Sequence, residues 1–219
     1  AAGAHPAARG NRRAGVSQPR HHPEAETLLA YVAGTLRAGF DLAVAAHLHG
    51  CAHCCAGVRR LERLGGALLD EIAPAALAEG ASAAMMARLD AAPPADPAPR
   101  GIDALFATAR RRWVAPRVWI AKLDTPHAPG DSIFLLGAGR GARTAPHRHR
   151  GRELTQVLQG ALRDGDTIYR AGDMAEHDAA QDHFPQVHGD AFCLCLFAIE
   201  GRLAARTLPG RIAFGLAGV

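Results

Sequence analysis

The sequence predicts a multi-domain protein in which a small α-helical bundle is followed by an all-β sandwich or barrel. Before position 90 the chain is rich in Ala and Leu, with apolar residues at helical spacing. Residues 91–100, AAPPADPAPR, contain four prolines, a density that neither a helix nor a central strand tolerates. Beyond this stretch, short apolar runs alternate with Gly, Pro and Asp, as in all-β domains. We therefore expect a flexible arm over 1–20, a helical domain over 21–90, a Pro-rich linker over 91–100 and a β-domain over 101–219.

Composition narrows the classes of function. Of the 25 basic residues, four are arginines in the acid-free segment 1–20, so the rest of the chain carries 21 basic and 21 acidic residues. This balance argues against a broad nucleic-acid-binding face. No apolar run approaches the roughly 18 residues of a membrane helix, so we expect no membrane span. Three of the five cysteines lie within Cys51–Cys55, which favours a metal site in a reducing, cytoplasmic setting over a disulfide framework.

Four helices are expected in the first part. Pro23 followed by Glu24 and Glu26 is typical of a helix start, because proline fits the first turn and acids favour the positive end of the helix dipole. This helix carries a near-helical apolar stripe of Leu28, Leu29, Val32 and Leu36. The further helices are expected over 40–48, from about 52 to 69, and over 74–89.

The second part has strand-like spacing. Strands are expected over 118–123, 133–136, 167–169 and 191–198. The segment 153–162, ELTQVLQGAL, predicts a strand, a glycine turn and a second strand.

The helical part contains a motif suited to a metal ion. His47, Cys51 and Cys54 form H-x3-C-x2-C, in which the cysteine pair places two thiolates within reach of one tetrahedral ion. His21 or His22 is the obvious source of a fourth ligand. Two thiolates and two imidazoles favour Zn²⁺ in a closed, structural site. The alternatives are chance clustering and a thioredoxin-like redox pair, although the βαβ context of the latter is missing.

A second motif lies in the β-part. His147, His149 and Glu153 form H-x-H-x3-E, and residues two apart on a strand share a face. With His183 from a later strand, they predict a site for Zn²⁺ or another divalent transition metal, either open and catalytic or filled and regulatory. An exposed loop that matches by chance is the plainer interpretation. His177 and His188 are rival fourth ligands, and Cys193 and Cys195 are most simply core residues.

Both motifs, in this order across a proline-rich linker, resemble those of the ChrR-type zinc anti-sigma factors, a family that joins a zinc-binding helical domain to a cupin, a double-stranded β-helix barrel. The resemblance covers residues 20–200, but is loose over 101–145 and places no counterpart for residues 1–20. Besides the two motifs it rests on the segments His21-His22, Ala33-Gly34-Thr35-Leu36, 147–164 (HRHRGRELTQVLQGALRD), Ala171-Gly172-Asp173 and Cys193-Leu194-Cys195.

The resemblance implies a transcription regulator rather than an enzyme. Such a protein would bind an extracytoplasmic-function sigma factor 1:1 through its helical domain and release it under singlet-oxygen-like stress sensed through the metal-bound cupin. It would bind neither DNA nor membranes. By the resemblance, His22, His47, Cys51 and Cys54 would hold one Zn²⁺, and His147, His149, Glu153 and His183 a second metal.

Two other functions remain open from the sequence. A three-His, one-Glu cupin site could belong to a metal-dependent oxygenase with the zinc bundle as a docking module. A DNA-binding zinc module is disfavoured by the balanced charge and by the lack of a second Cys/His pair. For the leading function, we expect the sigma factor to contact apolar helical faces, such as those of Leu28, Val32, Leu36 and Phe40.

Overall fold

The computed structural model describes residues 18–90, 106, 109–123, 130–143, 147–148, 151–179, 183–201, 204–205 and 215. The predicted linker over 91–100 and residues 1–17 of the predicted arm lie outside these residues. Residues 18–20, the end of that arm, lie against the β-part, where Pro19 contacts Gly172 and the backbone N–H of Arg20 donates to Asp173.

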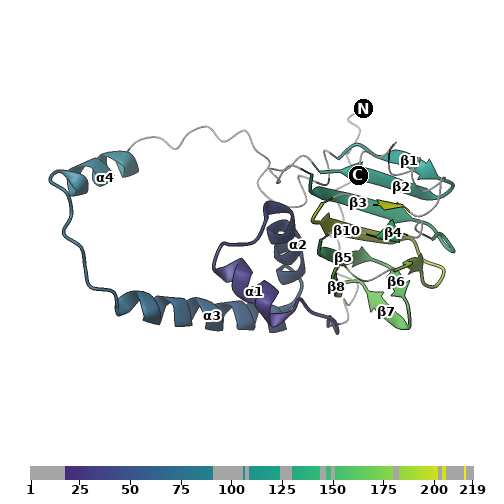
Figure 1. Ribbon diagram of the computed structural model, residues 1–219, viewed down its shortest axis with the longest axis horizontal. Helices are drawn as coiled ribbons and strands as arrows, with labels where there is room; N and C mark the ends of the chain where they lie inside the picture. The colour runs from purple at the N-terminus through teal and green to yellow at the C-terminus, as the bar shows by residue number, and fades with distance from the viewer. Residues whose placement is uncertain are drawn as a thin grey trace, which may run out of the picture.

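The first part is helical, as predicted. Its helices are α1 (Ala25–Val32), α2 (Ala38–Leu48), α3 (Ala52–Asp70) and α4 (Ala81–Asp90) (Figure 1). Helices α2 and α3 confirm the predicted helices. Helix α1 starts as predicted but ends at Val32, which leaves Leu36 outside it, and α4 begins at Ala81 and not near Pro74. Gly80 has a φ of 77°, in the left-handed region that a right-handed helix cannot include, so α4 starts after it. Figure 1 shows α3 running beyond α1 and α2, with α4 standing apart from the sheet.

The second part consists of antiparallel sheets. A six-stranded sheet has the order β1-β2-β3-β10-β5-β8, and a three-stranded sheet has the order β7-β6-β9. Strands β4 and β11 form a separate pair. The strands are β1 (Arg112–Ala115), β2 (Val118–Lys122), β3 (Ser132–Ala138), β4 (His147–Arg148), β5 (Glu153–Gln159), β6 (Ala161–Asp164), β7 (Thr167–Arg170), β8 (Met174–His177), β9 (Gln186–Val187), β10 (Cys193–Ile199) and β11 (Ala204–Ala205).

The predicted strand-glycine-strand segment is confirmed, but its strands do not form a hairpin. β5 belongs to the six-stranded sheet and β6 to the three-stranded sheet, so the chain changes sheets at Gly160. Gly160 has a φ of 76°, and a Cβ there would lie 2.4 Å from the carbonyl oxygen of Phe192. A side chain at this crossing would therefore be both strained and obstructed.

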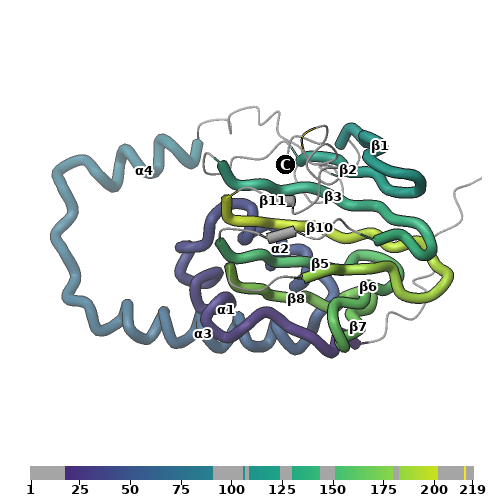
Figure 2. Tube along the Cα trace, turned by 45° about the vertical axis from the view of Figure 1, so that its right-hand side comes forward, coloured from purple at the N-terminus to yellow at the C-terminus, as the bar shows by residue number. Residues whose placement is uncertain are grey.

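The six-stranded sheet buries both of its faces. Along β10, Cys195 and Phe197 point into a core shared with the three-stranded sheet, whereas Leu196 and Ala198 point into a core on the outer face. Helix α2 covers that outer face and contributes Phe40 to its core (Figure 2). Phe40 is only 2% exposed, and burying a phenylalanine is worth about 2–3 kcal/mol. The helical part is thus packed onto the β-part.

No helix in the described stretches is both long and apolar enough to cross a membrane.

Candidate metal centres

The four residues predicted for the helical motif come together in the structure. His22 precedes α1, His47 lies near the end of α2, and Cys51 and Cys54 lie at the start of α3. One ligand atom from each of the four lies within 4.8 Å of all the others. The Nδ1 atom of His22 is 3.4 Å from the Sγ atoms of both Cys51 and Cys54. The edges of a tetrahedron with Zn–N and Zn–S bonds of about 2.0–2.3 Å are about 3.3–3.8 Å long, so the spacing suits zinc.

Local structure explains why the motif converges. The backbone N–H of Cys51 donates to the carbonyl of His47 across the short turn at Gly50, which keeps the ends of α2 and α3 adjacent. Cys51 is the N-cap of α3, and its Sγ accepts from the backbone N–H of Cys54 at 3.4 Å. Of the two candidate fourth ligands, His22 faces the thiols. The side chain of His21 is instead paired with the carboxylate of Asp173.

The protonation chemistry of this group also fits a zinc ion. Burial lowers the pKa of His47, and burial together with the charge of His53 lowers that of His22, which keeps both imidazoles in the neutral form that binds metals. Burial, reinforced by Cys51, raises the pKa of Cys54 to about 12, so a cation is needed to stabilise its thiolate. The Nε2 atom of His47 is buried and has no hydrogen-bond partner among the described residues, as expected of an atom kept for a metal.

A second cluster lies inside the β-part. Asp164 at the end of β6, His177 at the end of β8 and His183 each offer an atom within 4.8 Å of the others. Oδ2 of Asp164 is 2.8 Å from Nδ1 of His183 and 3.1 Å from Nε2 of His177. Glu153 on β5 completes the group, with its Oε1 atom 3.6 Å from Nε2 of His183. Buried carboxylates and imidazoles of this kind are transition-metal ligands.

The charges of this cluster favour a cation. Burial by itself lowers the pKa of His183, but hydrogen bonds to Asp164 and Glu153 and their negative charges outweigh it and raise the pKa to about 10. Burial raises the pKa of Asp164, whereas the hydrogen bond and charge of His183 lower it by more, so the net shift is downward. Positive charge is therefore stabilised where His183 faces the two carboxylates.

The structure describes only part of the predicted cupin set. Glu153 and His183 come together as predicted, and His177, a rival ligand at the sequence level, lies beside them. His147 pairs with Ala205 through its backbone in β4, but its side chain is not among those described, and His149 lies outside the described residues. The four-ligand set remains a prediction.

Asp164 was missed by sequence reasoning. In the sequence it precedes Gly165 and looks like an ordinary turn residue, a common place for aspartate. The fold brings the end of β6 close to His177 and His183, so that Asp164 faces both histidines. Asp164 lies eleven positions after Glu153, a separation that is not typical of any metal-binding motif.

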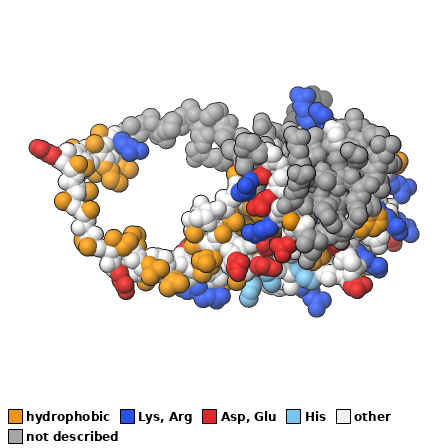
Figure 3. Space-filling model, in the orientation of Figure 1, with side chains coloured by type: hydrophobic (Ala, Val, Ile, Leu, Met, Phe, Trp, Pro, Cys, Tyr) orange, Lys and Arg blue, Asp and Glu red, His pale blue; other side chains and the backbone are white. Residues whose placement is uncertain are grey.

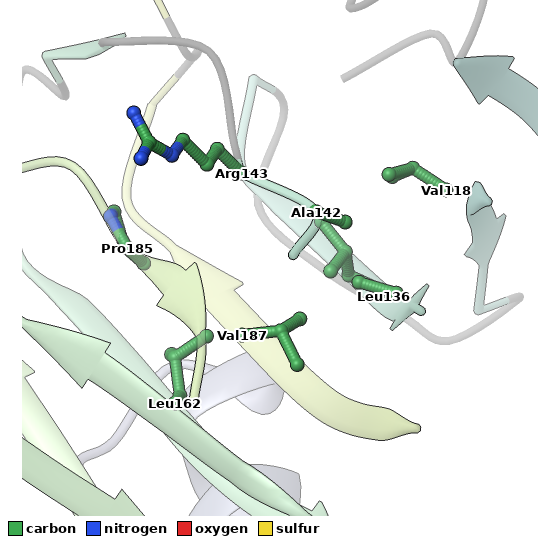
Figure 4. Close-up of a pocket in the computed structure, with 8 residues that line it drawn as sticks. Val118, Leu136, Ala142, Arg143, Leu162, Pro185 and Val187 are labelled. Atoms are coloured by element: carbon green, nitrogen blue, oxygen red, sulfur yellow. The ribbon is translucent and has the colours of Figure 1, made fainter. Parts of the chain in front are cut away.

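Two other features of the barrel interior are apolar. Cys193 and Cys195 belong to its core, with Sγ atoms 3.6 Å apart. A small pocket of about 10 Å³ lies between the sheets, lined by apolar side chains such as Leu136 and Leu162 together with Arg143 (Figure 4). Since its walls carry a single charged group and no cluster of ligands, it does not suit a metal.

The fold and the two clusters together define a protein with cupin-like β-sheets and a helical part that carries a candidate metal site of two histidines and two cysteines. No family model matches the sequence. The chain is 39% identical, over 197 residues, to the anti-sigma-E factor ChrR of Cereibacter sphaeroides, a match that covers 84% of this chain and 91% of that protein. The chain therefore belongs to the ChrR family of anti-sigma factors.

One solved structure agrees with this assignment. The crystal structure of Rhodobacter sphaeroides SigE in complex with the anti-sigma ChrR matches with a TM-score of 0.73 and 39% identity, over 84% of this chain and all of that one. An RmlC-like cupin protein of Ralstonia eutropha also aligns, at 22% identity and a TM-score of 0.43, over 47% of this chain and 69% of that chain.

Proposed function

We propose that this anti-sigma factor binds an extracytoplasmic-function sigma factor in a 1:1 complex and keeps it from RNA polymerase. The observation that carries the proposal is the apolar surface described next, on a chain that is 39% identical to a ChrR crystallised with SigE. Because a sigma factor meets RNA polymerase in the cytoplasm, that is where the protein would act.

An exposed apolar segment extends from the body of the molecule and is called the arm from here on; it is distinct from the N-terminal segment 1–20. It comprises the second half of α3, the connection after it and α4, and in Figure 3 hydrophobic side chains follow this whole stretch. Its large apolar residues, each more than half exposed, are Leu64, Leu68, Leu69, Ile72, Leu77, Met85, Met86 and Leu89. A contiguous apolar surface of this kind marks a protein-binding site.

The arm replaces the surface expected from the sequence. Of the four residues expected at the contact, Phe40 is buried against the β-sheet, and the partly buried Leu28 and Leu36 pack against the same core. Val32 is also partly buried, so this face presents little apolar surface to a partner. The exposed row on α3 instead has the i, i+4 spacing of Leu64 and Leu68, which suits contact with a helix of the partner.

The test is transcription in vitro with the cognate sigma factor and core RNA polymerase. Equimolar protein should abolish sigma-dependent transcripts, and the pair should elute as a 1:1 complex. The double variant Leu68→Asp/Met86→Asp should weaken sigma binding about tenfold or more, because it places charge in a buried contact. Trp113→Asp, which changes an exposed apolar residue on β1 outside the arm, is the matched control and should bind normally. Full inhibition by the arm variant would contradict the assigned surface.

We further propose that His22, His47, Cys51 and Cys54 hold a structural Zn²⁺, and that His147, His149, Glu153 and His183 hold a second divalent metal in the cupin. Asp164 and His177 would support that second site, since Asp164 contacts the ring of His183. Such a metal would hold together the carboxylate and imidazoles of separate strands. Oxidation at this site, with loss of the metal, would release the sigma factor.

Metal analysis separates this function from that of a cupin oxygenase. Two equivalents of zinc in the purified protein, with no oxygen consumption, would support a regulatory cupin. Iron in the cupin together with oxygen consumption would favour the enzyme.

A further inference from the structure

Strand β5 carries a residue of one candidate metal centre on its inner face and a residue that contacts the other centre on its outer face. Glu153 and Val157 point into the barrel interior, where Glu153 joins His183. Leu154 and Gln156 point the other way, toward the helices. Because side chains alternate along a strand, one backbone segment touches both candidate metal centres.

On the outer face, Gln156 contacts the zinc cluster directly. Its Oε1 atom lies 3.1 Å from Nδ1 of His47, and both side chains are at most 2% exposed. The Nε2 group of Gln156 donates to the carbonyl of Val157 at 3.1 Å, which leaves Oε1 as the atom that faces His47. Nδ1 of His47 must then carry the proton, and Nε2 is left unprotonated for a metal.

We propose that Gln156, a residue of the cupin, is the positioning residue for the zinc ligand His47, and that it couples the helical zinc site to the Glu153 cluster on the other face of β5. Metal-binding histidines almost always donate their second ring N–H to an acceptor, and loss of that acceptor costs about 10–100-fold in metal affinity. The inference rests on the proposed zinc site but not on sigma binding.

The neighbouring strand β8 repeats this arrangement. Its His177 lies in the inner cluster and is the register partner of Glu153. On the outer face, Glu176 accepts a hydrogen bond from the Thr27 hydroxyl at 2.7 Å and forms an ion pair with Arg152. If the inner cluster shifted either strand, the contacts of Gln156 with His47 and of Glu176 with Thr27 would therefore change as well.

The first test uses Co²⁺ as a probe of the helical site in the full-length, metal-free protein without sigma factor. The thiolate-to-cobalt absorption band reports this site, and its loss in Cys51→Ser assigns it. Gln156→Leu should weaken Co²⁺ binding by about 10–100-fold, and Gln156→Glu should restore it, because a carboxylate also accepts a hydrogen bond from the Nδ1–H group of His47. Gln159→Leu, the same change at an exposed position of β5, is the matched control.

Two results would overturn the positioning role. One is unchanged Co²⁺ affinity in Gln156→Leu. The other is Gln156→Glu binding as weakly as Gln156→Leu, since a purely structural role gains nothing from a buried carboxylate. Circular dichroism of each variant confirms that it is folded.

The second test measures the coupling. Glu153→Gln should weaken Co²⁺ binding at the thiolate site about fivefold or more, and should add no further loss in the Gln156→Leu background. His183→Gln serves as a second inner-face variant. Equal losses in both backgrounds, or no loss at all, would overturn the coupling. Either result leaves the transcription test of the proposed function untouched.

Discussion

At the scale of single residues, the Asp173 carboxylate joins the N-terminal segment to the barrel. It accepts hydrogen bonds from the backbone N–H groups of Arg20 at 2.6 Å, His21 at 3.1 Å and Arg170 at 2.8 Å. Burial raises the pKa of Asp173. The N–H groups and the His21 side chain stabilise the charged carboxylate and lower the pKa by more than burial raises it, so the net shift is downward.

We predict that Asp173→Asn lowers the free energy of unfolding by about 2–3 kcal/mol at pH 7. Since the folded pKa lies below the unfolded value of about 3.9, the contribution is present above about pH 4 and is lost as the pH falls through the folded pKa. Urea unfolding at pH 7 and pH 3 should show the gap between wild type and variant closing in acid. A gap of constant size would refute the electrostatic origin.

At the scale of elements, the cysteine-histidine cluster joins three segments of the helical part. His22 precedes α1, His47 lies near the end of α2, and both cysteines lie at the start of α3. A zinc ion there would cross-link these segments, so we expect metal binding and folding of this part to be coupled.

Cys54→Ser should therefore lose one equivalent of zinc and about 3 kcal/mol or more of stability. Cys55→Ser is its matched control, because the Cys55 thiol donates to the carbonyl of Leu48 and takes no part in the cluster. Zinc content and guanidinium unfolding check both variants. Equal zinc in the two proteins would contradict the assignment.

At the scale of the whole molecule, the proposed sensing site and the proposed sigma-binding surface lie in different parts of the chain. The inner cluster is buried in the barrel, whereas the arm that would bind the sigma factor extends from α3 and α4. Under this proposal, a signal from the inner cluster would have to cross the interface formed by α2 and the outer face of the sheet.

We expect Glu153→Ala to leave sigma binding intact and to blunt release of the sigma factor by singlet oxygen. Gel filtration of the complex after illumination with a photosensitiser measures the fraction released. Release at the wild-type rate would show that the inner cluster does not sense this oxidant.

The sequence predicted local features well because they depend on spacing. Helical periodicity, turn residues and the H-x3-C-x2-C motif are all encoded within a few positions, and His47, Cys51 and Cys54 indeed converge. Gln156 and Asp164 could not be found this way, because each acquires its partner only when a strand packs against a distant segment. Phe40 likewise looked available to a partner, since a single sequence does not reveal that α2 docks on the sheet.

That docking has a practical consequence for dividing the protein. A cut within 91–100 leaves the β-part without α2, and its outer face would then present Ile133, Leu154 and Leu196 to water. An uncovered apolar face of this kind promotes self-association. Each fragment would therefore be best produced alongside the other, so that the sheet is covered from the start by the helix that belongs on it.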